Sequence, residues 1–203
     1  MRTCASTERE MLTMKLLSAL VLGLAAVSAP AWATVSSTTE QTNAEQAKSP
    51  PARPNVVAQI EAMKRLAPIT GKWEGEGWIL NQGNRYDFRQ TEHVRYNLDG
   101  AVLLIDGRGY SAGAPDGAPP MFSAFAVINY DDRSVAFSFR SYTGGQVNDF
   151  PARIMADGGF EWDAGSTRYR IWVRDDGKWF ETGESKSGDD WTQFFEMNLS
   201  KVE

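Results

Sequence analysis

The sequence predicts an all-β protein: an up-and-down antiparallel β-barrel of about ten strands with one short N-terminal helix. After Thr70, turn signals such as Asp99-Gly100 and Gly144-Gly145 recur at short intervals, and the runs between them are rich in β-branched and aromatic residues. A meander of short strands loses its exposed edges when it closes into a barrel. The predicted strands are 71–80, 85–98, 101–110, 121–130, 134–142, 146–155, 159–163, 166–174, 178–185 and 190–202.

The first predicted strand determines how the barrel begins. Residues 71–79 read GKWEGEGWI. Because side chains alternate between the two faces of a strand, Trp73 shares one face with Gly75 and Gly77. Glycine inside a strand marks a sharp bend or the close approach of another backbone or of a ligand. We therefore expect Trp73 to anchor the closed end of the barrel, and the two glycines to let the strand curve.

A short amphipathic helix is predicted over residues 55–67. Val56, Ile60 and Met63 recur at spacings of four and three, which places them on one helix face. Pro54 stands at the start, and Pro68 is expected to end the helix. The helix either closes one end of the barrel or binds a partner.

The N-terminal residues have the pattern of an export signal. Lys15 precedes an apolar stretch over 16–29, and residues 31–33 (Ala-Trp-Ala) form a small-x-small cleavage site. We expect a start at Met11 or Met14, cleavage after Ala33 and a periplasmic or secreted protein. The apolar stretch is too short to span a bilayer comfortably, and no second one follows, so no membrane span is expected.

The chain accordingly divides into three predicted segments. Residues 1–33 are the signal peptide. Residues 34–53 are rich in Ser, Thr, Gln, Ala and Pro and are expected to form a disordered linker. Residues 54–203 are expected to form one barrel domain, since 203 residues with 42% hydrophobic content suffice for a single core.

Composition disfavours several classes of function. The only cysteine, Cys4, precedes the predicted cleavage site, which excludes disulfides, catalytic thiolates and cysteine-bound metals from the mature chain. A net charge of −5 without a basic stripe disfavours nucleic-acid binding. Acidic pairs such as Asp131-Asp132 lie at turns, where aspartate is favoured by its own backbone hydrogen bonds. Neither a metal nor another cofactor is therefore expected.

The second strand predicts a carboxyl group inside the barrel. Its interior face is lined by Tyr86, Phe88, Val94 and Tyr96. The same parity carries Gln90 and Glu92 inward. A buried carboxylate is costly unless it is paired and hydrogen-bonded. The candidate partners of Glu92 are Arg108, Tyr110, Arg140, Tyr142 and Arg170. Such a cluster orients the polar end of a ligand, or holds the strand register, or acts in catalysis.

The chain resembles the calycin superfamily. Lipocalins, fatty-acid-binding proteins and nitrobindins open their barrels with the G-x-W pattern found at residues 71–73, and the extended G-K-W-E-G-E-G is most similar to the nitrobindin-like branch. The chain is also similar to a bacterial family of lipocalin-like proteins of unknown function. This second likeness is carried by residues 90–92 with 98–100, by 129–131 and by 194–199. The resemblance covers most of 66–203 and implies a lipocalin-like barrel.

One feature of the nitrobindin-like branch is missing. Nitrobindins bind haem through a histidine close to the C-terminus, whereas the only histidine here is His93. Strand parity places His93 opposite Glu92, on the outer face. Haem is therefore not expected.

These observations together are interpreted as an exported lipocalin-like barrel that binds a small, partly apolar ligand in its interior. The predicted ligand-binding residues are Tyr86, Phe88, Gln90, Glu92, Tyr96, Arg108, Tyr110, Arg140 and Tyr142, with Val94 and Phe139 as further walls. Two alternatives stay open. One is a barrel enzyme that uses Glu92 as general acid or base. The other is a structural envelope module whose barrel is filled by side chains.

Overall fold

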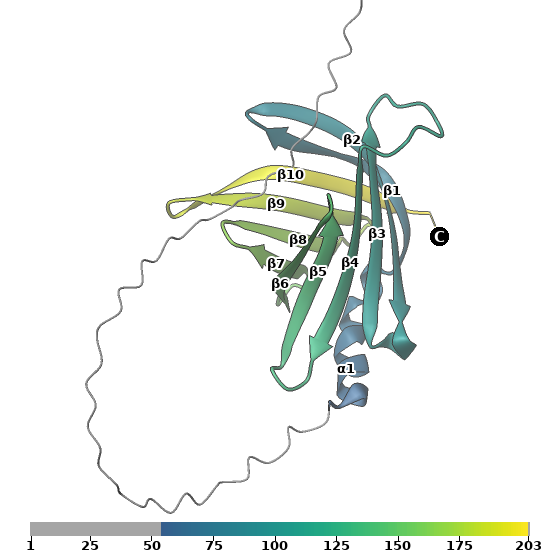
Figure 1. Ribbon diagram of the computed structural model, residues 1–203, viewed down its shortest axis with the longest axis vertical. Helices are drawn as coiled ribbons and strands as arrows, with labels where there is room; N and C mark the ends of the chain where they lie inside the picture. The colour runs from purple at the N-terminus through teal and green to yellow at the C-terminus, as the bar shows by residue number, and fades with distance from the viewer. Residues whose placement is uncertain (1–53, 203) are drawn as a thin grey trace, which may run out of the picture. The chain divides into compact units, whose positions relative to one another are not determined.

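The computed structural model describes residues 54–202, which form a closed antiparallel barrel (Figure 1). The predicted signal peptide, the predicted linker and residue 203 lie outside the described residues. Helix α1 (Val56–Met63) continues into the 3-10 helix η1 (Lys64–Ile69), and a second 3-10 turn is η2 (Leu98–Gly100). The strands are β1 (Gly71–Asn81), β2 (Asn84–Asn97), β3 (Val102–Ser111), β4 (Phe122–Asp131), β5 (Ala136–Thr143), β6 (Gln146–Ile154), β7 (Phe160–Ala164), β8 (Thr167–Val173), β9 (Trp179–Ser187) and β10 (Asp190–Lys201).

The strand order follows the order of the chain. Each strand pairs antiparallel with the next, and β1 closes the ring by pairing with β10, so that Gly75 lies opposite Leu199. The predicted up-and-down barrel is confirmed, and the strand ends fall within two residues of the predicted ones. No helix within residues 54–202 is long and apolar enough to cross a membrane.

The helical segment differs from the prediction in its second half. Asn55 caps α1 by accepting a hydrogen bond from the backbone nitrogen of Ala58 at 3.1 Å. The α-helix ends at Met63, and the chain continues as a 3-10 helix that contains Pro68. A proline ring clashes with the carbonyl group four residues earlier in an α-helix, which here is that of Lys64. The chain therefore tightens from Lys64 onward rather than stopping before the proline.

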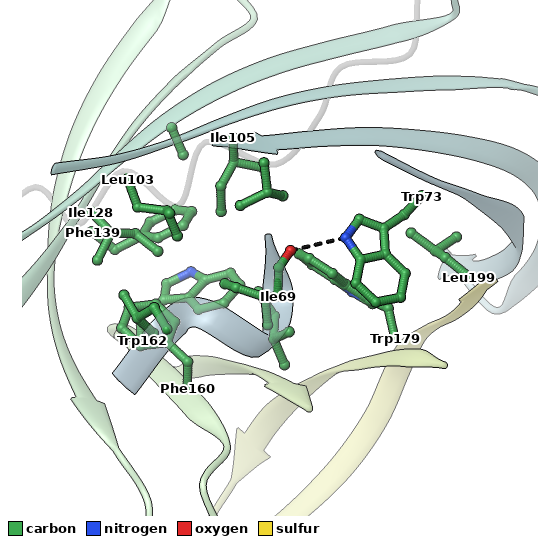
Figure 2. Packing of buried hydrophobic residues seen from close by; sticks show 14 of the residues in the cluster. Ile69, Trp73, Leu103, Ile105, Ile128, Phe139, Phe160, Trp162, Trp179 and Leu199 are labelled. Carbon is green, nitrogen blue, oxygen red and sulfur yellow. Dashed lines mark hydrogen bonds between the residues drawn. The ribbon is translucent and has the colours of Figure 1, made fainter. Parts of the chain in front are cut away.

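The end of the barrel beside α1 is closed by large apolar side chains. Trp73 is 2% exposed, and its indole nitrogen donates a hydrogen bond to the carbonyl oxygen of Ile69 at 2.9 Å (Figure 2). Its ring lies edge-on to the ring of Trp179, with the centroids 5.7 Å apart. Met63 and Leu66 are buried in the same cluster. The helical segment thus closes one end of the barrel, as predicted.

The glycines of β1 permit a close approach of the neighbouring strand. A Cβ atom added at Gly75 would lie 2.8 Å from the Cα atom of Leu199 and would overlap the carbonyl oxygen of Asn198. One added at Gly77 would lie 2.5 Å from the Phe88 ring. The predicted close backbone approach is confirmed, because β10 occupies the space that a side chain at Gly75 would need.

Strand β10 contains an irregularity that the sequence did not reveal. Its register against β9 shifts between Gln193 and Phe195, where Phe194 is the additional residue. Beyond the shift, Phe195 lies opposite Gly183 and its ring stacks near that of Phe88 inside the barrel, with the centroids 5.8 Å apart. The bulge therefore keeps Phe195 on the interior face.

Replacing Gly75 by alanine tests the closure of the barrel. We expect Gly75→Ala to lower the free energy of unfolding by about 3 kcal/mol, because overpacking against backbone atoms forces β1 and β10 apart. Gly113→Ala is the matched control, since nothing lies within 4 Å of its added Cβ atom, and it should be neutral or stabilise slightly. Urea unfolding followed by tryptophan fluorescence measures both. Equal stability of the two variants would contradict the close approach.

Candidate ligand-binding site

Glu92 brings a carboxyl group into the barrel interior, as the sequence predicts. The residue is 7% exposed. Its Oε1 atom accepts a hydrogen bond from the side-chain nitrogen of Gln90 at 2.6 Å. Its Oε2 atom has no hydrogen-bond partner, and it is the only buried side-chain nitrogen or oxygen in residues 54–202 of which this is true. A buried acceptor without a donor is costly, so Glu92 is a candidate contact for a ligand.

Two glycines make room for this polar pair. In the register of β2 against β3, Glu92 lies opposite Gly107 and Gln90 lies opposite Gly109. A Cβ atom at Gly107 would lie 2.6 Å from Oε1 and 2.7 Å from Oε2 of Glu92, and one at Gly109 would lie 2.9 Å from the Gln90 side-chain oxygen. The carboxyl group therefore lies flat against β3, in a space that any larger residue there would fill.

Burial changes the acidity of Glu92. Desolvation raises its pKa from the usual value of 4.5 to about 7, the hydrogen bond from Gln90 lowers it in part, and the nearby charge of Asp106 raises it further. At neutral pH the carboxyl group thus exists in both protonation states. It can accept a hydrogen bond in one state and donate one in the other.

A second acid, Glu181 on β9, lies on the interior face and was not singled out in the sequence. It is 8% exposed, and its Oε2 atom accepts a hydrogen bond from the indole nitrogen of Trp179 at 3.1 Å. Burial raises its pKa well above the ordinary value, and the charge of Glu92 raises it further. Burial raises the pKa of Tyr169 to about 12, and the negative charge of Glu181 contributes to this shift. Two acids therefore interact within the barrel.

The register shows why Glu181 was missed. In β9 the acids Glu181 and Glu184 look alike in the sequence, because both are embedded in a run of polar residues. Only the pairing places Glu181 between Ile171 and Met197, both of which are buried. One sequence signal could have found it. Trp179 and Glu181 are two residues apart and so share a face of β9, and once Trp179 is assigned to the core, Glu181 must face inward too.

Aromatic rings form a wall of the barrel interior that reaches Tyr169, the residue whose pKa the Glu181 charge raises. The rings of Phe139 and Trp162 are stacked with their centroids 4.3 Å apart, and Trp162 stacks in turn on Tyr169 at 5.2 Å. Figure 2 shows Phe139 and Trp162 among the buried side chains. Toward the end away from α1, inward-facing side chains stay half-buried: Ile79, Ser141, Thr143, Asn148, Phe150 and Phe195. That end of the interior is therefore accessible to solvent, whereas the helix end is closed.

The predicted wall residues of β2 divide between the two ends. The side chains that face inward and are buried are Phe88, Gln90, Glu92 and Val94. Tyr96 is half-buried, and its hydroxyl group donates a hydrogen bond to the carbonyl oxygen of Met63 at 2.8 Å, so it supports the closed end. Tyr86 is 43% exposed at the far end of the strand. His93 is exposed on the outer face, as predicted. Whether any of these residues contacts a ligand stays a prediction.

The expected pairing of Glu92 with Arg140 or Tyr142 is wrong. Phe139 faces the interior of β5, so strand parity turns Arg140 and Tyr142 outward. The guanidinium group of Arg140 donates two hydrogen bonds to Asp149 at 2.6 and 2.7 Å. The sequence left the face of this strand open, because aromatic residues occur on both sides of it.

The other expected partners of the buried carboxyl group also lie on the outer face. Arg108 forms an ion pair with Asp106 at 3.2 Å, and Tyr110 belongs to the same outward set in β3. Arg170 donates a hydrogen bond to Glu161 at 2.9 Å, on the outside of β7 and β8. Basic residues favour the hydrated outer face, so the interior acid has Gln90 as its side-chain partner instead.

No metal site is indicated by the described residues. Across 54–202, no group of three or more histidine, cysteine, aspartate and glutamate side chains is placed to hold a metal ion. Glu161, the third buried acid of the strands, is enclosed by the guanidinium groups of Arg153 and Arg170. It is therefore a satisfied structural charge, in contrast to Glu92.

The buried acids predict an unusual dependence of stability on pH. The folded protein holds the Glu92 proton up to about pH 7, whereas the unfolded chain releases it near 4.5, so the free energy of unfolding should fall as pH rises through this window. The loss from Glu92 is on the order of 3 kcal/mol, and Glu181 adds to it in the same direction. Asp106 and Tyr169 are the other titratable groups coupled to the pair.

Urea unfolding from pH 4.5 to 8 measures this loss. Glu92→Gln should flatten the profile and be more stable than the parent at pH 8, since it keeps the hydrogen-bonding shape without the charge. Glu76→Gln is the matched control on the exposed face of β1 and should leave the profile unchanged. A parent protein that gains stability across this pH range would contradict the burial of an uncompensated carboxyl group.

Comparison with known proteins supports the fold. No family model and no curated protein sequence matches the chain. Among solved structures, Rv2717c from M. tuberculosis is similar, with a TM-score of 0.51, 11% sequence identity and coverage of 70% of this chain and 98% of that one. The S-type phycobiliprotein lyase CPES from Guillardia theta matches with a TM-score of 0.47, 12% identity and coverage of 71% and 93%. At 11% identity the likeness to Rv2717c shows the fold alone, an antiparallel β-barrel.

Proposed function

We propose that the protein is an exported carrier or receptor that binds a small, partly apolar molecule inside the barrel. The observation that carries this proposal is the carboxyl group of Glu92, 7% exposed and with one oxygen atom unpartnered, inside a barrel whose helix end is sealed and whose other end has half-buried inward side chains. Export rests on the sequence pattern of residues 14–33 and is part of the proposal. The place of the chain in the nitrobindin-like branch likewise stays a prediction.

Energetics favour a binding site over a purely structural cluster. A carboxyl group that serves only to hold strand register is expected to have both oxygen atoms satisfied, as Glu161 has under Arg153 and Arg170. Glu92 has one neutral donor for two oxygen atoms. A ligand that supplies the missing donor removes this cost, and its apolar part gains contact with the stacked wall of Phe139 and Trp162.

One observation supports an enzyme as second candidate. The pKa of Glu92 is raised to about 7, which suits a general acid or base at neutral pH. In that case a small molecule retained by the protein would be converted to a product, and Glu92→Gln would reduce the rate by about a hundredfold or more. In a binding protein, the same substitution only changes affinity.

Binding in the interior is tested with N-phenyl-1-naphthylamine, an uncharged aromatic probe that fluoresces in apolar surroundings. We expect saturable binding to the purified barrel domain. Ser141→Trp should weaken this binding by about tenfold or more, because Ser141 faces inward and is half-buried toward the solvent-accessible end, so an indole there would occupy interior space. Fluorescence titration measures both dissociation constants.

The neighbouring position on the other face provides the control. Tyr142→Trp places the same indole on the outer side of β5, where Tyr142 is 38% exposed, and should leave probe binding unchanged. Urea unfolding of both variants separates loss of the site from loss of the fold. Absence of saturable binding by the parent protein would favour the structural module with a filled barrel and would overturn the proposal.

A further inference from the structure

The charges inside the barrel are of one sign. On the inward faces of the strands, the charged side chains that lie within the barrel are Glu92 and Glu181. The basic residue with inward parity, Lys201, is exposed at the last position of β10, where its ammonium nitrogen lies over the Trp73 ring at 5.3 Å. The described interior thus contains two acids and no arginine or lysine to balance them.

Basic side chains of the middle strands are held on the outer face by other groups. Their outer-face neighbours are Asp106 for Arg108, Asp149 for Arg140, Asp163 for Arg153, Glu184 for Arg168, Glu161 for Arg170 and the Trp191 ring for Lys186. None of these can turn inward through a hydrogen-bonded sheet. When the two acids are ionised, no arginine or lysine of residues 54–202 lies inside the barrel to balance them, so a bound ligand can supply the positive charge.

We propose that the barrel takes ligands in which a cationic nitrogen group is joined to an apolar or aromatic body, and that Glu92 and Glu181 bind the cation together. This inference rests on the proposed function and specifies its ligand class. At a pH where both acids are ionised, each buried carboxylate carries a large desolvation cost, and a cation bound by both offsets that cost. Each acid already accepts one hydrogen bond from a neutral donor, Glu92 from Gln90 and Glu181 from Trp179. The Oε2 atom of Glu92 still has no partner.

The surroundings select an organic cation rather than a metal ion. Calcium and magnesium need six or more oxygen ligands, and residues 54–202 offer no group of three or more candidate ligating side chains. Aromatic faces, in contrast, attract ammonium groups. Tyr169, whose pKa the Glu181 charge raises, stacks on Trp162 and lies edge-on to Phe195, which in turn stacks on Phe88 of the Glu92 strand. An amine with an aromatic or aliphatic body therefore matches both the charge and the walls.

Three dansyl compounds that differ only in the tail test this charge selectivity. Dansylcadaverine has a cationic tail, N-butyl dansylamide a neutral tail and dansyl-aminohexanoate an anionic tail. In fluorescence titrations at pH 8 with the purified parent protein, we expect the cationic compound to bind about tenfold or more tightly than the neutral one, and the anionic compound to bind weakest.

Paired variants assign the selectivity to the two acids. The double variant Glu92→Gln with Glu181→Gln should bring the ratio of the cationic to the neutral dissociation constant toward one. The double variant Glu74→Gln with Glu76→Gln removes two exposed acids from the outer face of β1 and should keep the parent ratio. A ratio that falls equally in both would show general surface attraction and would overturn the assignment.

The outcomes separate this inference from the function on which it rests. If N-phenyl-1-naphthylamine binds the parent but the three dansyl tails bind equally, or the anionic tail binds best, the cation inference fails and the binding function stands. If neither that probe nor any dansyl compound binds, the binding function fails, and the inference fails with it.

Discussion

The structure depends on one end of the barrel being sealed. The hydrogen bond from the Trp73 indole to the carbonyl group of Ile69 joins the first strand to the helical segment that covers that end. Trp179 and Met63 complete the seal from β9 and α1. Trp73 and Gly75 lie on the same face of β1, two positions apart, so the contact with the helical segment and the close approach of β10 that closes the ring are neighbours on one strand.

The polar side chains of the interior lie outside the apolar cluster that seals the helix end. Beyond the apolar plug, the inward positions alternate between rings and small or polar residues, and the acids Glu92 and Glu181 lie between the plug and the solvent-accessible end. Each acid is accommodated locally: Gly107 leaves space opposite Glu92, and Trp179 donates a hydrogen bond to Glu181. Neither acid is neutralised by a charge. The fold therefore tolerates the cost of burying two acids without a counter-charge. Such a costly cluster is where ligand binding or catalysis is to be expected.

Most of the fold could be predicted from periodicity, and the site only in part. Turn residues and alternation gave the strand order, and Trp73 gave the closed end, because these signals are local. The inward position of Glu92 followed from the same parity. Its partners could not be predicted, because β5 carries aromatic residues on both faces and only pairing with Ile128 turns Phe139 inward and Arg140 outward.

Long-range register was the missing information in two further places. Glu181 is an ordinary acid in the sequence and becomes an interior one only through its pairing between Ile171 and Met197. The bulge at Phe194 depends on how β10 accommodates β9 and leaves no local signature. Pro68 was correctly recognised as incompatible with an α-helix, but the alternative of a 3-10 helix was not foreseen.

The central claim is that Glu92 is a buried, uncompensated carboxyl group inside the barrel. Carbon-13 NMR titration of glutamate side-chain carboxyl groups tests it most directly, with Glu92→Gln and Glu181→Gln used to assign the signals. The account predicts a signal that titrates near pH 7 and is lost in Glu92→Gln. A Glu92 signal that titrates near 4.5, as for a hydrated side chain, would contradict it.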